Sequence, residues 1–152
     1  MLTIGDKMPY FEVMDQDGNK VTSSELTGKK TIIYFYPKDN TSGCTAEACN
    51  LRDNYGALSA KGYNVVGVSK DSVASHKKFE TKYELPFTLL SDTELSCIQA
   101  YDVWKEKKMC GKVGMGVVRT TYIINEEGII EHVMPKVKPD TNAAEILEYL
   151  AK

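Results

Sequence analysis

The sequence predicts an α/β fold in which a central mixed β-sheet carries helices on both faces and begins with an N-terminal β-hairpin. Three observations support this prediction. Apolar segments of strand length alternate with segments of helical periodicity between residues 29 and 103. Residues 10–26 alternate in polarity around Asp17-Gly18, a dipeptide typical of hairpin turns. A later hairpin pattern and a helical pattern complete the chain.

The individual elements follow from local patterns. After the first hairpin, Ser23 or Ser24 is expected to cap a short helix. The run at 29–37 is apolar and ends at Pro37, as expected of a buried strand, and apolar residues at helical spacing predict a helix at 45–60. The remaining predicted elements are strands at 63–69 and 86–92, helices at 72–83, 93–103 and 141–152, and a hairpin at 117–134 that turns at Glu126 to Gly128.

The chain of 152 residues is long enough for one hydrophobic core and short for two, so we expect a single domain over residues 1–152. The formal net charge of -2 gives no general attraction to nucleic acid. No apolar run approaches the roughly 20 residues of a membrane span, and the N-terminus lacks the pattern of a secretory signal. We therefore expect a cytoplasmic protein with no nucleic-acid or membrane partner.

Basic side chains gather late in the chain, where Glu106 interrupts them. We expect this segment to be a solvated loop rather than a site for a polyanion. The basic residues concerned are Lys105, Lys107, Lys108, Lys112 and Arg119.

The four cysteines are too few for a disulfide-stapled secreted scaffold, so a cysteine pair here indicates catalytic, redox or metal chemistry. They are Cys44, Cys49, Cys97 and Cys110. Cys44 lies between a predicted central strand and a predicted helix, at the strand's carboxyl end, where sites form in such folds. The dipole and free N–H groups of a helix N-terminus favour a thiolate.

A helix terminus alone does not ionise a thiol fully. Near-complete ionisation of a free cysteine at neutral pH requires roughly 3 kcal/mol, and the terminus offers about 2 kcal/mol at most. A nearby cation must supply the remainder. Arg119 is the candidate, because "VVRTT" places it among apolar residues at the start of a predicted buried strand, where an arginine needs a partner. An arginine that snorkels out at the strand end is the alternative.

Greater ionisation gains only about thirtyfold in thiolate, so any large acceleration must come from the transition state. Four groups could together hold a small oxygen-rich substrate and stabilise charge on a departing oxygen. They are the backbone N–H groups of Gly43 and Cys44, the Thr41 hydroxyl and the Arg119 guanidinium. Pro37, which has no N–H donor, could shield the thiolate from water. Together these groups suit a peroxide.

Cys44 and Cys49 are too far apart to bridge within an intact helix. Five residues rise about 7.5 Å and turn about 140°, which separates the Cα atoms by roughly 8 to 9 Å, beyond the ~7 Å limit for a disulfide. If peroxide converts Cys44 to a sulfenic acid, Cys49 can condense with it only after the first helical turns unwind. We therefore interpret the pair as attacking and resolving thiols.

These residues give the chain a resemblance to peroxiredoxins, most closely to the bacterioferritin comigratory protein, or Q-type, subfamily. Pro37, Thr41 and Cys44 match the family's P-x3-T-x2-C signature, and "GCTAEAC" matches the subfamily's helix with its resolving cysteine. The stretch "RTTYIIN" matches the strand that carries the family's arginine. The resemblance extends over nearly the whole chain.

The resemblance implies a thioredoxin-like fold and a peroxidase that reduces hydrogen peroxide and organic hydroperoxides in antioxidant defence. It implies that thioredoxin returns electrons through a disulfide between Cys44 and Cys49, and that no flavin, haem or metal takes part. It also implies a monomer, with a weak dimer as the alternative. Glu47 is expected to order the helix by hydrogen bonding and, with Gly43, to line the substrate site; an exposed glutamate is the alternative.

Two features depart from the family pattern. Some Q-type members place the resolving cysteine one helix later, at a position that aligns with about Glu80, where this chain has no cysteine. Cys110 stands where relatives commonly carry an aromatic residue, and we interpret it as a bystander rather than a partner in alternative disulfides. Cys97, within "LSCIQAY", is interpreted as a small buried hydrophobic residue.

Three other functions compete with a peroxidase. A thiol-disulfide oxidoreductase shares the predicted fold but normally needs C-x-x-C, which the sequence lacks. A zinc-binding or redox-sensing module would combine the cysteines with His76 and His132, but their spacing is unusual for zinc, and we expect both histidines at the surface. A hydrolase would need a histidine beside Cys44, which the sequence does not place there.

Overall fold

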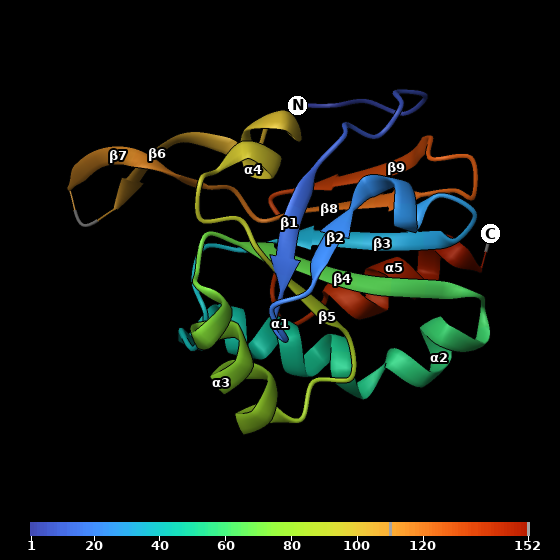
Figure 1. Ribbon diagram of the computed structural model, residues 1–152, viewed down its shortest axis with the longest axis horizontal. Coiled ribbons are helices and arrows are strands. Elements are labelled where there is room, and N and C mark those ends of the chain that lie inside the picture. The colour runs from blue at the N-terminus through green and yellow to red at the C-terminus, as the bar shows by residue number, and fades with distance from the viewer. Residues whose placement is uncertain (110, 152) are drawn as a thin grey trace.

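The protein is described by a computed structural model over residues 1–109 and 111–151. Seven strands form its main sheet, and two further strands form a separate hairpin. The main sheet contains β1 (Glu12–Asp15), β2 (Lys20–Thr22), β3 (Lys30–Phe35), β4 (Tyr63–Ser69), β5 (Thr88–Ser91), β8 (Thr120–Ile124) and β9 (Ile130–Pro135), and the hairpin contains β6 (Trp104–Met109) and β7 (Lys112–Val117). The order in the main sheet is β2-β1-β5-β4-β3-β8-β9 (Figure 1).

Five α-helices and a short 3-10 helix complete the fold. They are η1 (Ser23–Leu26), α1 (Ser42–Asp53), α2 (Tyr55–Ala60), α3 (Val73–Tyr83), α4 (Ser96–Ala100) and α5 (Asn142–Leu150). No helix in the described part of the chain is both long and apolar enough to cross a membrane.

The middle strands, β3 and β4, are buried on both faces of the sheet. They pair in parallel along their length, from Lys30 opposite Tyr63 to Phe35 opposite Val68. Successive side chains of β3 enter two different hydrophobic clusters, because neighbouring residues of a strand point to opposite faces. The largely apolar run at 29–37 is therefore typical of a strand that is buried on both faces of the sheet.

The helices are divided unequally between the two faces (Figure 1). On one face, Leu51 of α1, Leu58 of α2 and Ile146 of α5 pack in one cluster with sheet residues, together with part of α3. On the other, Ile98 of the short α4 packs with Phe11 from the N-terminal segment. The predicted α/β class, with a mixed sheet, helices on both faces and an N-terminal hairpin of β1 and β2, is confirmed.

Two of the predicted helices have different bounds in the structure. The helix expected at 45–60 begins earlier, at Ser42, and divides into α1 and α2 at Asn54, whose φ of −108° and ψ of 4° interrupt the helical geometry. The helix expected at 93–103 is reduced to α4, because Leu95 before it adopts a left-handed φ of 65°. Apolar periodicity marks the buried face but does not reveal such local breaks.

The cap of the first short helix is also different from the prediction. Thr22, rather than Ser23 or Ser24, precedes η1 as its N-cap residue. The Thr22 N–H donates to the Glu25 carboxylate at 2.7 Å, which is one half of a capping box.

The basic segment is a β-hairpin, and the prediction of a solvated loop is wrong. β6 and β7 pair antiparallel from Trp104 opposite Val117 to Met109 opposite Lys112. The prediction overlooked a period-two signal in β7, where Val113, Met115 and Val117 alternate with glycines; β6 is rich in lysine and carries no such alternation. The interpretation of Cys110 concerns a residue outside the described range.

Substitution of Gly67 tests how closely β3 and β4 pack. A Cβ at this position would lie 2.8 Å from the ring of Tyr34, which is buried on the neighbouring strand. We expect Gly67→Ala to lower the free energy of unfolding by about 1–3 kcal/mol through overpacking, as measured by urea denaturation.

Gly56→Ala provides the matched control, because a Cβ at this exposed position of α2 would have no neighbour within 4 Å. It should raise the free energy of unfolding by about 0.5–1 kcal/mol. Equal effects of the two substitutions would contradict the packing argument.

Candidate active site

Cys44 lies in the first turn of α1, just after the loop that leaves β3. Thr41 is the N-cap residue of this helix, and its carbonyl accepts the Thr45 N–H at 2.8 Å. The Cys44 side chain is buried in the cluster between α1 and the sheet. The sulfur is therefore near the N–H end of a helix in a poorly solvated position, where the helix dipole is weakly screened.

The guanidinium of Arg119 contacts the Cys44 sulfur. Arg119 Nη2 lies 3.2 Å from Cys44 Sγ, and Nη1 lies 3.2 Å from Glu47 Oε1. A Cβ on Gly43 would lie 2.7 Å from Nη2, so a larger residue there would displace the guanidinium. The structure thus brings together four of the residues selected from the sequence, and Arg119 does not extend away into solvent as the alternative supposed.

Glu47 is fully buried, which excludes the alternative of an exposed glutamate. Burial raises the pKa of its carboxyl from 4.5 to about 7, although the Arg119 guanidinium opposes this rise. At this depth the cost of desolvating the carboxylate exceeds the attraction of the ion pair. Glu47 Oε2 has no hydrogen-bond partner among the described residues, which fits a carboxyl that is partly protonated near neutral pH.

Thr41 and Pro37 lie in the loop that leads to α1. The Thr41 hydroxyl donates to the Lys38 carbonyl at 3.0 Å, so its oxygen keeps lone pairs that can accept another hydrogen bond. Pro37 is half-buried, directly after the buried residues of β3. Neither side chain has a hydrogen bond to Cys44 in this conformation of the described residues.

The described cysteines are free thiols in three different settings. Cys44 is buried, Cys49 is half-buried, and both belong to the intact α1, so they cannot be bonded in this conformation. Cys97 is completely buried, and burial together with the Asp92 charge raises the pKa of its thiol well above the ordinary range. The interpretation of Cys97 as a small buried hydrophobic residue is confirmed.

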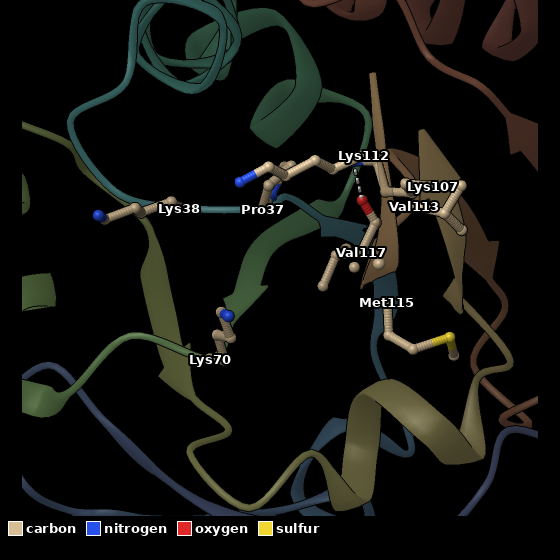
Figure 2. A pocket seen from close by; sticks show the side chains of 10 residues that line it. Pro37, Lys38, Lys70, Lys107, Lys112, Val113, Met115 and Val117 are labelled. Atoms are coloured by element: carbon tan, nitrogen blue, oxygen red, sulfur yellow. Dashed lines mark hydrogen bonds between the residues drawn. The ribbon is translucent and has the colours of Figure 1, made fainter. Parts of the chain in front are cut away.

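An open cavity of about 400 Å³ lies beside Pro37, between the loop after β3 and the β6–β7 hairpin (Figure 2). Its apolar lining includes Val113, Met115 and Val117. The basic residues that line it are Lys38, Lys70, Lys107 and Lys112. Burial and the nearby Arg119 charge lower the pKa of Lys107, whose ammonium group donates to the Val117 carbonyl at 2.7 Å. The hairpin thus adds positive charge and apolar surface near the thiol.

Comparison with known proteins identifies the family. The model of the AhpC/TSA family matches residues 4–133. A putative peroxiredoxin bcp from Coxiella burnetii is 47% identical over 146 residues, which cover 96% of this chain and 97% of the relative. Peroxiredoxin Bcp from Bacillus subtilis is 43% identical, with 98% and 95% covered. The chain belongs to the AhpC/TSA family of peroxiredoxins.

Solved structures agree with this assignment. A PrxQ mutant from Xylella fastidiosa superposes with a TM-score of 0.93 at 32% identity, covering 99% of this chain and 96% of that one. A bacterioferritin comigratory protein from Xanthomonas campestris, studied for its alkyl peroxide reduction activity, gives 0.87 at 35% identity, with 93% and 90% covered. The expected resemblance to the Q-type peroxiredoxins, the thioredoxin-like fold and the thiol-dependent peroxidase activity are confirmed.

His76 is buried in this peroxiredoxin, so the expectation of a surface histidine is wrong. The signal was present in the sequence, because His76 lies three residues before Phe79 and both occupy the buried face of α3. His132 is half-buried and stacks on Tyr149, with ring centroids 4.1 Å apart. A histidine at helical spacing with aromatic residues should have been assigned to the packed face.

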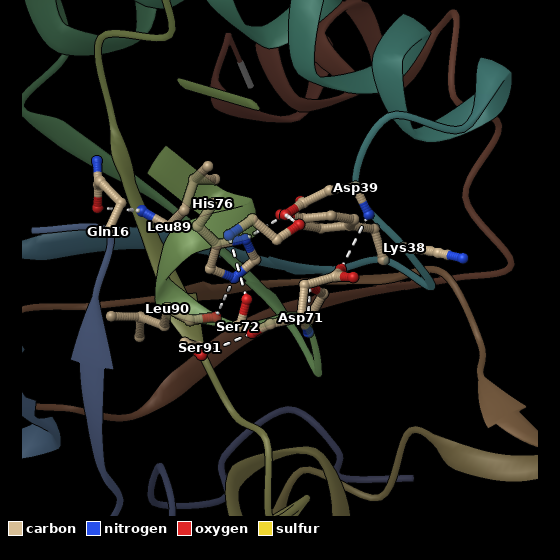
Figure 3. A network of polar contacts seen from close by, with 12 residues as sticks. Gln16, Lys38, Asp39, Asp71, Ser72, His76, Leu89, Leu90 and Ser91 are labelled. Carbon is tan, nitrogen blue, oxygen red and sulfur yellow. Dashed lines mark hydrogen bonds and ion pairs between the residues drawn. The ribbon is translucent and has the colours of Figure 1, made fainter. Parts of the chain in front are cut away.

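Asp39, Asp71 and His76 place ligand-type atoms within 4.8 Å of one another. This group contains none of the described cysteines, so it does not match the zinc site of the competing interpretation. His76 Nδ1 lies against Asp39, and Nε2 lies against the Leu90 carbonyl, so both ring nitrogens already have protein partners. The group is a hydrogen-bonded network that sequence reasoning missed (Figure 3).

Glu47 predicts a pH dependence of stability. Its pKa is raised in the folded protein, so the protonated form favours folding; the contribution is complete below the unfolded pKa near 4.5 and is lost as pH rises through about 7. Between pH 4.5 and pH 8, ionisation of Glu47 should lower the free energy of unfolding of the wild-type protein by on the order of 3 kcal/mol. Glu47→Gln should lack this decrease, as measured by urea unfolding at several pH values. Glu148→Gln, on the exposed side of α5, is the control and should leave the profile unchanged.

Substitution of Gly43 tests the effect of displacing the Arg119 guanidinium from Cys44. Gly43→Ala would place a methyl group 2.7 Å from Arg119 Nη2, so the side chain must withdraw from Cys44. We expect the rate constant for thiol oxidation by hydrogen peroxide to fall about tenfold or more, because a charge-assisted hydrogen bond is lost. Stopped-flow measurement should show the change while Gly56→Ala retains the wild-type rate; retention of that rate in both variants would show that the contact is dispensable.

Proposed function

We propose that Cys44 is the peroxidatic nucleophile of this peroxidase and that Cys49 resolves the oxidised product. The observation that carries the proposal is the contact of Arg119 with the Cys44 sulfur at the start of α1. Arg119 places a permanent cation 3.2 Å from the sulfur, and the N-terminus of α1 lies beside it, so both attract negative charge on the sulfur. The thiolate is the nucleophilic form of cysteine.

In the first step the Cys44 thiolate attacks the outer oxygen of a hydroperoxide. The sulfur–oxygen bond forms as the oxygen–oxygen bond breaks, which leaves a sulfenic acid on Cys44 and releases water or an alcohol once the departing oxygen has gained a proton. Positive charge from Arg119 and the free N–H groups of Gly43 and Cys44 stabilise that oxygen as charge develops on it. The same fork remains oriented by its second bond, to Glu47.

The loop residues complete the substrate site. The Thr41 hydroxyl donates to Lys38 and so presents lone pairs, which suit the O–H group of the incoming hydroperoxide. Pro37 offers no N–H group and limits the access of water to the sulfur. The neighbouring cavity has apolar lining at Val113 and Met115, which supports organic hydroperoxides as substrates in addition to hydrogen peroxide.

In the second step the Cys49 thiol condenses with the Cys44 sulfenic acid, forming a disulfide and releasing water. Both residues lie in α1, so its first turns must unwind before the sulfur atoms can meet. A dithiol of the thioredoxin class then reduces the disulfide by exchange and restores both thiols. We propose that the chain acts in the cytoplasm as a monomeric domain.

The two cysteines have separable roles. Cys44→Ser should abolish peroxide consumption, because a serine hydroxyl does not ionise at neutral pH. Cys49→Ser should complete one turnover at the wild-type rate and then accumulate the sulfenic acid, detected by mass spectrometry after trapping with a dimedone-type reagent. Continued consumption by the thioredoxin system requires both thiols.

Cys97→Ser is the matched control, because Cys97 is buried on the opposite side of the sheet from α1. It should retain turnover if it folds. A disulfide at normal yield in Cys49→Ser would transfer the resolving role to Cys97 or Cys110, whereas full turnover by Cys44→Ser would remove Cys44 as the nucleophile.

A further inference from the structure

A buried hydrogen bond joins the loop between β3 and α1 to the neighbouring helix α3. His76 of α3 has no exposed side-chain area, and Asp39 of the loop is 3% exposed. His76 Nδ1 lies 2.6 Å from Asp39 Oδ2, and Nε2 lies 2.8 Å from the Leu90 carbonyl (Figure 3). The ring is therefore held between the loop on one side and β5 on the other.

The partners of these groups define a continuous hydrogen-bond network. The Leu90 carbonyl can only accept, so His76 Nε2 carries a hydrogen. Asp39 accepts from the Tyr36 hydroxyl at 2.6 Å and from the Ser75 hydroxyl at 2.9 Å. His76 Nδ1 makes a further hydrogen bond to the same carboxyl group, so Asp39 is bonded both to Tyr36, just after β3, and to α3.

The next contacts extend the attachment along the loop. The Asp39 N–H donates to Asp71 at 2.9 Å. Asn40 adopts a left-handed φ of 60°, and its side-chain oxygen accepts from the Tyr83 hydroxyl at 3.1 Å. Two consecutive loop residues are thus bonded to groups outside the loop, immediately before α1 begins.

Catalysis places opposite demands on this loop. Peroxide reduction requires Cys44 against Arg119, which needs the loop and the first turn of α1 in the conformation described above. Disulfide formation requires the same turn to unwind. Contacts that stabilise the folded loop therefore favour the first step and oppose the second.

We propose, given the function proposed above, that the His76–Asp39 hydrogen bond is a latch that positions the peroxidatic loop and controls how the Cys44 sulfenic acid is divided between two fates. One fate is condensation with Cys49. The other is attack on a second hydroperoxide, which gives a sulfinic acid and releases another molecule of water or alcohol. A strong latch prolongs the folded state, so it increases the share of sulfinic acid at high peroxide concentration.

The test compares two rate constants in the full-length protein. Quenched-flow mass spectrometry follows thiol, sulfenic acid, disulfide and sulfinic acid after mixing with hydrogen peroxide. In Asp39→Asn and in His76→Gln, the ratio of the rate constant for disulfide formation to that for thiol oxidation should rise about tenfold or more. Both single variants and the double variant should give similar ratios, because each disrupts the same His76–Asp39 hydrogen bond. The sulfinic acid formed per turnover should fall in parallel.

Two further variants separate a latch from a general loss of stability. Ile130→Val, in the cluster on the opposite face of the sheet, lowers stability without touching the loop and should leave the ratio unchanged. Ser75→Ala removes only one hydrogen bond to Asp39, so it retains the fold and should raise the ratio about threefold.

The outcomes also separate the latch from the proposed function. A ratio within twofold of wild type in Ser75→Ala and in whichever variants of His76 and Asp39 fold would overturn the latch, even with Cys44 confirmed as the nucleophile. A similar rise in Ile130→Val would equally overturn it. Peroxide consumption by Cys44→Ser would instead reject the proposed function itself.

Discussion

The contact between the Arg119 guanidinium and the Cys44 sulfur is the interaction on which the rest of this structure depends. The two residues lie 75 positions apart in the sequence, and the sheet brings them together. β8 runs antiparallel to β3 with Thr120 opposite Phe35, so Arg119 lies at the edge of the sheet where β3 ends and the peroxidatic loop begins. β8 is buried along its whole length, and its register with β3 runs from Thr31 opposite Ile124 to Phe35 opposite Thr120. The catalytic distance is thus a consequence of hydrophobic pairing far from the sulfur.

Glu47 orients the Arg119 guanidinium through a hydrogen bond. Its carboxyl group is buried, and its pKa is raised to about 7. The opposing effects of burial and of Arg119 leave it balanced between charged and neutral forms near physiological pH. An exposed glutamate would hold the arginine more weakly and stay ionised. Burial of Glu47 therefore orients the Arg119 guanidinium. It also makes the charge of Glu47 sensitive to pH near neutrality.

The sequence predicted the features that rest on long patterns or on distinctive residue types. The strand at 63–69 has the expected bounds because its apolar run is continuous, and Arg119 was selected because an arginine among apolar residues needs a partner. The hairpin of β6 and β7 was missed although apolar residues alternate along β7, because the lysines of β6 carry no such pattern and favoured a solvated loop. The burial of His76 was predictable from its helical spacing to Phe79, whereas its contacts with Asp39 and Leu90 form only on folding and were not.

The sequence at the start of α1 fits the two conformations that the proposed mechanism requires of this helix. Thr41 makes no side-chain capping bond, no acidic residue stands in the first turn, and the helix opens with Ser42 and Gly43, which are weak helix formers. Local preference therefore contributes little to the turn that carries Cys44, and tertiary contacts must maintain it. In the proposed mechanism, oxidation of Cys44 gives a neutral sulfenic acid, which Arg119 attracts less than a thiolate. The first turn of α1 could then unwind at the stage at which that mechanism requires Cys49 to reach the oxidised sulfur.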